Sequence, residues 1–191
     1  MLKRFRDHLS FLKQYIKNPK QVGAVFPSTR FLVQKMLETV DFEHARIIVE
    51  LGSGEGKFTR EILKRMRPDA RLYVIEINQK FISKLMKIND DRLVLISESA
   101  EKLKEILSRL QIRSADCFIS GLPLLSFRKE IKDRMIDQIA GHLKDGHPFV
   151  QFSYLPLHCN LFKKYFNYVE IKGFVLLNIP PAFVFVCKHA K

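Results

Sequence analysis

Three glycines and two glutamates stand at spacings that suit the binding of a small polar ligand. The string E-L-G-S-G-E-G occupies residues 50–56, after the apolar run 47–49. Glycine lets the backbone turn tightly and approach a ligand, and a following helix offers its N-terminal amides. A second acid, Glu76, ends the apolar run 72–75. Because ligands of open α/β sheets bind at the carboxyl ends of strands, a carboxylate there can accept both hydroxyls of a ribose.

The glycine spacing separates this loop from the dinucleotide-binding fingerprint. That fingerprint, G-x-G-x-x-G, needs a glycine at position 57, where this chain has lysine. The observed G-x-G-x-G, with Glu50 two residues before it, resembles the S-adenosylmethionine loop of class I methyltransferases. The resemblance implies that Glu50 faces the methionine ammonium of that cofactor. The loop residues expected to bind the cofactor are Gly52, Ser53, Gly54 and Gly56.

The contact to the adenine ring is less specific in this sequence. Class I methyltransferases usually place an aspartate near the adenine amino group, after the third strand. This chain has Ser97-Glu98-Ser99-Ala100 there, so the resemblance leaves Ser99 or Glu98 for that contact. Ser99 is also a suitable N-cap for the next helix. Ser120, after the fourth strand, is the last residue expected beside the cofactor.

The elements that position these residues alternate between short apolar runs and amphipathic stretches. Strands are predicted over 47–51, 71–75, 92–96, 115–119 and 148–152. Helices are predicted over 57–66, 79–86, 101–110 and 127–142. Strands that alternate with helices of this length indicate parallel βαβ units and a doubly wound sheet.

The C-terminal part predicts two more strands, over 168–177 and 182–188. The segment Asn178-Ile179-Pro180-Pro181 leaves no room for a crossover helix, so these strands form an antiparallel hairpin. The predicted fold is therefore a Rossmann-like α/β fold. It has a seven-stranded, mostly parallel sheet with an antiparallel C-terminal hairpin and helices on both faces, which is typical of class I methyltransferases.

Charge and composition restrict the partners. The chain has 33 Lys and Arg against 20 Asp and Glu, a net charge of +13, which favours a polyanionic partner, either nucleic acid or an anionic membrane. A hydrophobic fraction of 47% excludes a disordered chain. Cys117, Cys159 and Cys187 are widely spaced outside any C-x-x-C, which indicates neither a disulfide framework nor a metal site. A cytoplasmic location follows from these reduced thiols.

Residues 1–20 predict a basic amphipathic helix, and we separate them from a methyltransferase domain over 21–191. Six basic residues surround an apolar face that is made by Leu2, Phe5, Leu9, Leu12 and Ile16. Such a helix is typical of the membrane interface. The other interpretation, a helix packed on the domain with solvated lysines, has equal weight on composition alone.

The loop after the fourth predicted strand bears on the methyl acceptor. Amino methyltransferases of nucleic acids carry (N/D)-P-P-(Y/F) at this point, and the aromatic residue stacks on an extruded base. Here Ser120 replaces the amide and Leu124 the aromatic residue. Leu122, Pro123 and Leu124 instead predict an apolar lip beside the methyl donor, which disfavours a stacked base.

Five strings in order resemble one family, the membrane-associated bacterial phospholipid N-methyltransferases, a branch near the ribosomal RNA adenine dimethylases. They are N-P-K-Q-V-G-A-V-F-P-S-T-R over 18–30, E-L-G-S-G-E-G over 50–56, S-G-L-P-L-L-S-F over 120–127, V-Q-F-S-Y over 150–154 and N-I-P-P-A over 178–182. The resemblance implies methylation of phosphatidylethanolamine towards phosphatidylcholine, with S-adenosylmethionine as donor. It also implies peripheral association with the inner face of the membrane.

Three residues are candidates for handling the lipid headgroup. Tyr154 follows the fifth strand, where its ring could hold a methylated cation and its hydroxyl could orient the amine. His158 could accept a proton or contact the lipid phosphate. Arg30, after a predicted N-cap at Ser28, is a candidate phosphate ligand.

Two other functions stay open at this point. One is a methyltransferase of RNA or of a soluble amine, which would share the donor loop and the basic charge. The other is a membrane-binding protein that retains the fold without turnover.

Overall fold

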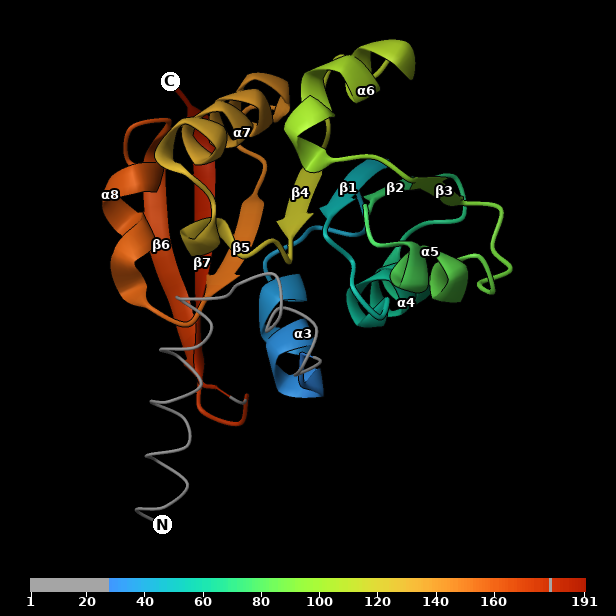
Figure 1. Ribbon diagram of the computed structural model, residues 1–191, viewed down its shortest axis with the longest axis horizontal. Helices are drawn as coiled ribbons and strands as arrows, with labels where there is room; N and C mark the ends of the chain where they lie inside the picture. Colours follow the sequence, from blue (N-terminus) through green and yellow to red (C-terminus); the bar gives the residue numbers. More distant parts are fainter. Residues whose placement is uncertain (1–27, 179) are drawn as a thin grey trace.

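One seven-stranded sheet organises the part of the chain that the structure describes, residues 28–178 and 180–191 (Figure 1). The structure is a computed structural model, and its strand order is β3-β2-β1-β4-β5-β7-β6. The strands are β1 (Ile47–Leu51), β2 (Arg71–Ile75), β3 (Leu93–Ile96), β4 (Cys117–Ser120), β5 (Phe149–Ser153), β6 (Phe166–Val175) and β7 (Ala182–Ala190). Strands β1 to β5 pair in parallel, while β7 runs antiparallel to both β5 and β6. The predicted fold class is confirmed.

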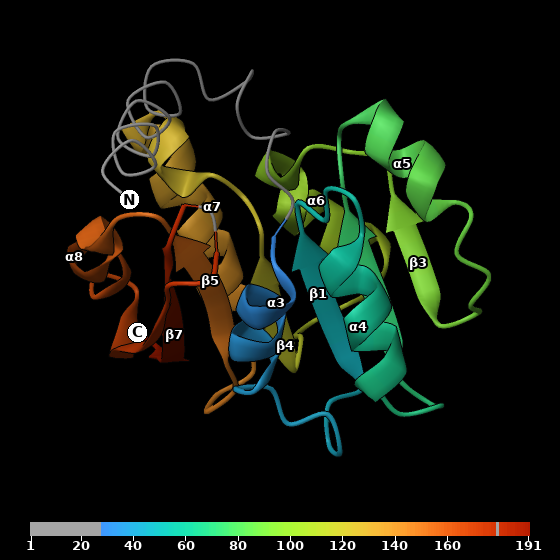
Figure 2. The same ribbon diagram turned by 90° about the horizontal axis from the view of Figure 1, so that it is seen from below.

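Helices cover both faces of this sheet (Figure 2). One face packs against α3 (Arg30–Leu37), α4 (Lys57–Arg65) and α5 (Gln79–Leu85). The other packs against α6 (Leu103–Arg109), α7 (Lys129–His142) and α8 (Cys159–Phe162). Short 3₁₀ helices are η1 (Ala100–Lys102), η2 (Leu124–Ser126) and η3 (Pro156–His158). The four helices predicted between the strands are confirmed as α4, α5, α6 and α7, whereas η2, η3 and α8 are too short to show a periodic pattern.

Alternation along β1 decides which residue faces which layer. Val49 and Leu51 are fully buried in the cluster with α6 and α7, and Ile48 is buried in the cluster with α3 and α4. Because successive side chains of a strand point to opposite faces, Glu50 shares the face of Ile48. Its carboxylate is therefore directed towards α4.

Several element boundaries differ by one or two residues from the sequence predictions; for example, β4 begins at Cys117 rather than residue 115, and β6 spans Phe166–Val175 rather than 168–177. The N-cap of α3 is Thr29, whose hydroxyl accepts from the Leu32 amide at 3.4 Å, so the prediction of Ser28 was wrong. Strand β3 begins at Leu93 rather than residue 92, and the Arg92 guanidinium donates to the carbonyls of Leu63 (2.7 Å) and Met66 (3.0 Å) at the end of α4. The helix predicted within residues 1–20 lies outside the described residues.

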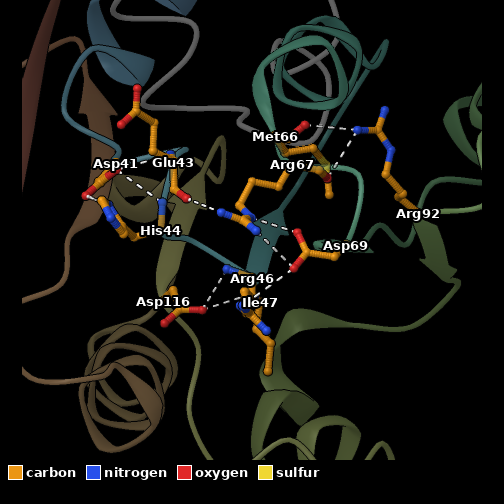
Figure 3. Close-up of polar contacts among 10 residues, drawn as sticks. All are labelled: Asp41, Glu43, His44, Arg46, Ile47, Met66, Arg67, Asp69, Arg92 and Asp116. Carbon is orange, nitrogen blue, oxygen red and sulfur yellow. Dashed lines mark hydrogen bonds and ion pairs between the residues drawn. The ribbon is translucent and has the colours of Figure 1, made fainter.

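The amino-terminal edge of the sheet is tied together by a buried carboxylate (Figure 3). Asp116 accepts from the amides of Arg46 and Ile47, both at 2.9 Å, and from the Lys144 ammonium at 3.0 Å. Burial alone would raise the pKa of Asp116, but these hydrogen bonds outweigh it and hold the pKa below its ordinary value. Asp116 thus fixes the start of β1 against β4.

The opposite edge carries the β6–β7 hairpin, whose turn extends beyond the end of β5 (Figure 1). The last residue of β5, Ser153, pairs with Phe183, so residues 176–178, 180 and 181 lie past the strand end. Buried Asn178 accepts from the Thr29 amide at 3.1 Å and donates to the Pro180 carbonyl at 2.7 Å. The base of the turn is therefore fixed against the start of α3.

The Asp116 clamp gives a stability prediction. Asp116→Ala leaves two amide groups without their acceptor, so the free energy of unfolding should fall by about 3 kcal/mol at pH 7. Because the folded-state pKa is lowered, this stabilisation is present above the unfolded-state value. The difference from wild type should therefore shrink as the pH falls below about 4. Urea denaturation at several pH values measures both effects.

Asp69→Ala is the matched control, since Asp69 also contacts Arg46 (3.6 Å) but is exposed. Exposed ion pairs contribute little, so its effect should stay below about 1 kcal/mol. Equal effects of the two variants would contradict the assigned role of Asp116.

Candidate functional site

The loops after β1, β2 and β4 meet at the carboxyl edge of the sheet, because those three strands are parallel neighbours. The Gly52 amide donates to the Ile75 carbonyl at 2.9 Å, and the Gly121 amide donates to the Leu51 carbonyl at 2.8 Å. These bonds continue the ladder beyond the strand ends. The loop after β1 is thereby held between the two neighbouring loops.

Glycine is required at two positions of this edge. A Cβ on Gly121 would lie 2.5 Å from the Gly52 carbonyl oxygen, a distance at which the two loops could not stay in contact. Gly54 has a φ of +54°, and a Cβ there would meet no atom within 4 Å. The left-handed conformation explains the residue type, and the open space shows that this side of the loop is unfilled.

Glu76 holds the glycine loop in this structure. One carboxylate oxygen accepts from the Gly54 amide (3.0 Å) and the Ser53 hydroxyl (3.5 Å), and the other from the amides of Ile77 and Asn78, both at 2.9 Å. A carboxylate has about four acceptor positions. Glu76 therefore stands where the sequence predicts, and a ribose would have to replace part of this shell.

Glu50 is fully buried and only half satisfied. Its Oε2 accepts from the Thr59 hydroxyl of α4 at 2.7 Å, whereas Oε1 has no hydrogen-bond partner among the described residues. Burial, opposed by the Thr59 hydrogen bond and reinforced by the nearby charge of Glu76, raises the pKa of Glu50 to about 8. A cation that reached Oε1 would restore the ionised form.

These features fit the binding of S-adenosylmethionine. The unsatisfied oxygen of Glu50 suits an ammonium group, the open side of Gly54 leaves room for a ligand, and Glu76 directly follows the neighbouring strand β2. In the part of the chain that the structure describes, no group of three or more metal-binding side chains is brought together.

The remaining predicted cofactor residues are engaged locally. Ser99 caps η1 by accepting from the Glu101 amide at 3.3 Å, and Glu98 pairs with Arg109. Ser120 is buried and accepts from the Leu122 amide at 3.2 Å. Neither Ser99 nor Glu98 has a buried unsatisfied atom, and their assignment to adenine stays a prediction.

The predicted substrate loop borders a small apolar pocket at the ends of β4 and β5. The pocket is lined by Leu122, Pro123, Leu124, Leu125, Phe152, Ser153, Tyr154 and His158. Gln151, which is fully buried, donates to the Leu122 carbonyl at 3.1 Å and fixes this loop. Leu124 is only 1% exposed and packs in the core. The pocket therefore brings the predicted substrate residues of this loop together with the two predicted catalytic residues.

Tyr154 and His158 differ in their surroundings. The Tyr154 ring lies edge-on to Phe152 with ring centroids 5.6 Å apart, and burial raises the pKa of its hydroxyl to about 12. His158 is 2% exposed and stacks on Phe162, and neither ring nitrogen has a partner among the described residues. Burial, assisted by the charge of Lys132, lowers the pKa of His158 to about 4. At neutral pH the tyrosine is protonated and the imidazole is neutral.

Arg30, the candidate phosphate ligand, lies apart from the apolar pocket. Arg30 is the first residue of α3, is exposed, and stands over the Phe31 ring at 4.9 Å. It is not among the residues that line the apolar pocket. Phe5, Leu9 and Leu12 lie outside the described residues.

Sequence reasoning missed two residues that support the site. Thr59 is a polar residue on the buried face of α4, beside Phe58 and Ile62, and a polar group in such a position indicates a buried partner. Gln151 interrupts the apolar run of β5 in the same way. Both signals are present in the sequence, but neither indicates which group the buried polar side chain hydrogen-bonds.

Comparisons with known proteins agree with this geometry. The sequence profile of the ribosomal RNA adenine dimethylase family matches residues 11–158. An ornithine lipid N-methyltransferase of Singulisphaera acidiphila is 29% identical over 189 residues, which cover 97% of this chain and 98% of that protein. Ribosomal RNA small subunit methyltransferase A of Mycoplasma capricolum is 30% identical over 111 residues, 56% of this chain and 40% of that protein.

Solved structures share the fold at low identity. Precorrin-6y C5,15-methyltransferase from Geobacter metallireducens superposes with a TM-score of 0.64 at 14% identity, covering 86% of this chain and 94% of that one. The N-methyltransferase NodS from Bradyrhizobium japonicum, in complex with S-adenosylhomocysteine, gives 0.58 at 11% identity, covering 82% and 83%.

The match to the family profile spans most of the chain, including the glycine loop, the substrate loop and both predicted catalytic residues. The protein is an S-adenosylmethionine-dependent methyltransferase, and the chain belongs to the ribosomal RNA adenine dimethylase family.

Proposed function

We propose that this methyltransferase transfers methyl groups to the amine of a lipid headgroup at a membrane surface. The observation that carries the proposal is a set of exposed apolar side chains on the edge where the donor loop ends. Leu176 and Leu177 in the β6–β7 turn are 70% and 63% exposed, and Leu157 in η3 is 64% exposed. All three follow strand ends at the carboxyl edge of the sheet.

Exposed leucines on this edge suit a bilayer better than an aqueous substrate. Full burial of a leucine side chain contributes about 1.5–3 kcal/mol, so insertion of the turn would stabilise a bound state. Asn178 fixes the base of the turn, which keeps the two leucines directed past the end of β5. A net charge of +13 adds attraction to anionic headgroups.

Phosphatidylethanolamine is the acceptor that the sequence predicts, with phosphatidylcholine as its methylated product. The similarity to an ornithine lipid N-methyltransferase along 97% of this chain favours an amino-acid lipid as a second acceptor. Both headgroups carry a primary amine and an anionic group. A zwitterionic aminolipid is therefore the substrate class we propose.

The apolar pocket offers no aromatic platform at the position where nucleic acid methyltransferases stack a base. Leu124 occupies that position and is buried in the core. The family profile and the Mycoplasma relative keep RNA as the competing acceptor. The burial of Leu124 favours the lipid amine over RNA.

The chain contributes mainly alignment and the exclusion of water. The bound donor supplies a methyl group already activated on a sulfonium. Glu50 and the glycine loop would hold it, while Leu122 and Leu125 keep water from the pocket. Tyr154, protonated at neutral pH, can orient the amine through its hydroxyl and hold the methylated cation on its ring. The low pKa of His158 favours hydrogen bonding to the headgroup over proton acceptance.

A direct assay tests the proposal. The protein is incubated with labelled S-adenosylmethionine and with vesicles of phosphatidylethanolamine, vesicles of ornithine lipid, or total RNA. Label in the lipid phase is expected with at least one vesicle type. Label in RNA alone would overturn the proposal, and an absence of label in every arm would do so as well.

Glu50→Gln should weaken binding of S-adenosylmethionine by about 100-fold, because the buried partner of the ammonium loses its charge. In the wild type, the donor-free carboxyl must lose a proton to pair with that ammonium. Affinity should therefore rise by up to about tenfold per pH unit from pH 6 and level off above about pH 8. Isothermal titration calorimetry measures both the affinity and the proton release.

Glu55→Gln is the control, since Glu55 lies in the same loop but is exposed and paired with Lys84 at 2.5 Å. It should bind the donor like the wild type. The raised pKa means that ionised Glu50 destabilises the donor-free fold, so Glu50→Gln should be at least as stable as wild type at pH 9. A donor affinity that is unchanged in Glu50→Gln would remove this role.

Leu176→Asp combined with Leu177→Asp should lower partitioning onto anionic vesicles by at least about tenfold, because two inserting side chains become charged. Vesicle flotation measures the partitioning, and donor binding should not change. Met86→Asp is the control, since Met86 is 74% exposed at the end of α5, away from the strand ends. Equal partitioning of all three proteins would contradict insertion of the turn.

A further inference from the structure

A basic groove of about 240 Å³ lies beside the apolar pocket, between the start of α7 and the η3–α8 segment. Lys129 and Lys132 of α7 line it on one side, and Leu157 and Lys164 line it on the other. The groove and the apolar pocket share two residues, Leu125 and His158. A ligand in the groove would therefore lie next to the predicted position of the methyl acceptor.

The groove has an excess of positive charge that the described residues do not neutralise. Asp133 also lines it and pairs with Lys129 at 3.6 Å. Within residues 28–178 and 180–191, neither the Lys132 nor the Lys164 ammonium forms an ion pair. Three ammonium groups thus face one carboxylate, and two of them are available to an anion.

His158, which lines both the apolar pocket and the basic groove, adds an unsatisfied polar group between them. It is almost completely buried, yet both ring nitrogens lack partners in the described part of the chain. Leaving buried polar groups unpaired costs about 1–3 kcal/mol each. A neutral imidazole has one donor and one acceptor nitrogen, and a zwitterionic headgroup offers acceptor oxygens on its anion and N–H donors on its ammonium.

We propose that this groove binds the anionic group of the aminolipid headgroup, so that Lys132 and Lys164 hold the anion while the amine enters the apolar pocket. The shared chemistry is a phosphate or carboxylate a few bonds from a primary amine. The inference rests on the proposed function and assigns a subsite to it. Exposed Leu157 at the rim gives the acyl chains an apolar path towards the bilayer.

The arrangement explains how a headgroup is selected at the membrane. An amine alone would bind the apolar pocket weakly, since its solvated charge has few partners there. Anchoring the anion at lysines supplies charge-assisted hydrogen bonds and fixes the distance between anion and amine. A lipid without an amine could occupy the groove but would present no nucleophile.

Binding is tested first with water-soluble probes, so that neither a membrane nor turnover is involved. The full chain, with ¹³C-labelled histidine, is titrated with phosphoethanolamine, ornithine, ethanolamine and inorganic phosphate. A His158→Asn sample identifies the His158 resonance. The His158 signal should shift on addition of phosphoethanolamine or ornithine, and at least one of these probes should have a Kd at least about tenfold lower than that of ethanolamine. The tighter of those two probes identifies the anion as phosphate or carboxylate.

Two outcomes of this titration would overturn the proposal. One is a His158 signal that no anionic probe moves. The other is a signal that responds to a short RNA but to neither phosphoethanolamine nor ornithine, which would assign the groove to a polynucleotide.

Lysine variants then connect the groove to catalysis. Lys132→Ala combined with Lys164→Ala should raise the KM for the lipid by about tenfold, with little change in kcat or donor affinity. Lys163→Ala is the matched control, because Lys163 neighbours Lys164 and is exposed but does not line the groove. A wild-type KM in the double variant would refute the groove while lipid methylation still stood. Absence of lipid methylation by the wild type would instead refute the proposed function.

Discussion

The burial of Glu50 is the constraint on which the site depends. A carboxylate removed from water is costly unless a charge or hydrogen bonds compensate it, and here one hydroxyl compensates one oxygen. The donor-free protein meets this cost by holding the proton, as its raised pKa shows. The bound donor would meet it with an ammonium. In the proposed role, the donor ammonium would pair with the unsatisfied Oε1 of Glu50, whose side chain the alternation of β1 directs towards α4.

The two edges of the sheet differ in whether their buried ionisable groups are satisfied. At the amino-terminal edge, Asp116 accepts two amides and a lysine, so each charge there stabilises the junction of β1 and β4. At the carboxyl edge, Glu50 and His158 keep unsatisfied atoms among the described residues. A fold stabilised at its amino-terminal edge can tolerate unsatisfied groups at its carboxyl edge. The carboxyl edge is where ligands of open α/β sheets bind.

The sequence predicts the sheet well because strand periodicity and glycine spacing are local. The strands, the turn at Gly54 and the acids Glu50 and Glu76 all follow from residue types within a few positions. The shell of Glu76 does not, since its donors come from two loops that meet only in the folded sheet. The hydroxyl that caps α3 belongs to Thr29 because Asn178, 149 residues away, receives the Thr29 amide. Long-range partners of this kind leave no periodic signal.

The same limit applies to Leu124, whose hydrophobicity fits both a lip and a core position. Leu124 packs in the core cluster that includes residues of α7, whereas the leucines of η3 and the β6–β7 turn are exposed and are the ones that we propose contact the bilayer. The basic residues also differ in whether they form ion pairs. Several arginines at the amino-terminal edge are paired, as Arg67 is with Asp69, whereas Lys132 and Lys164 in the groove are not. Under the proposed function, these unpaired lysines and the exposed leucines would turn this side of the molecule towards an anionic bilayer, and positive charge would lie beside the proposed headgroup groove.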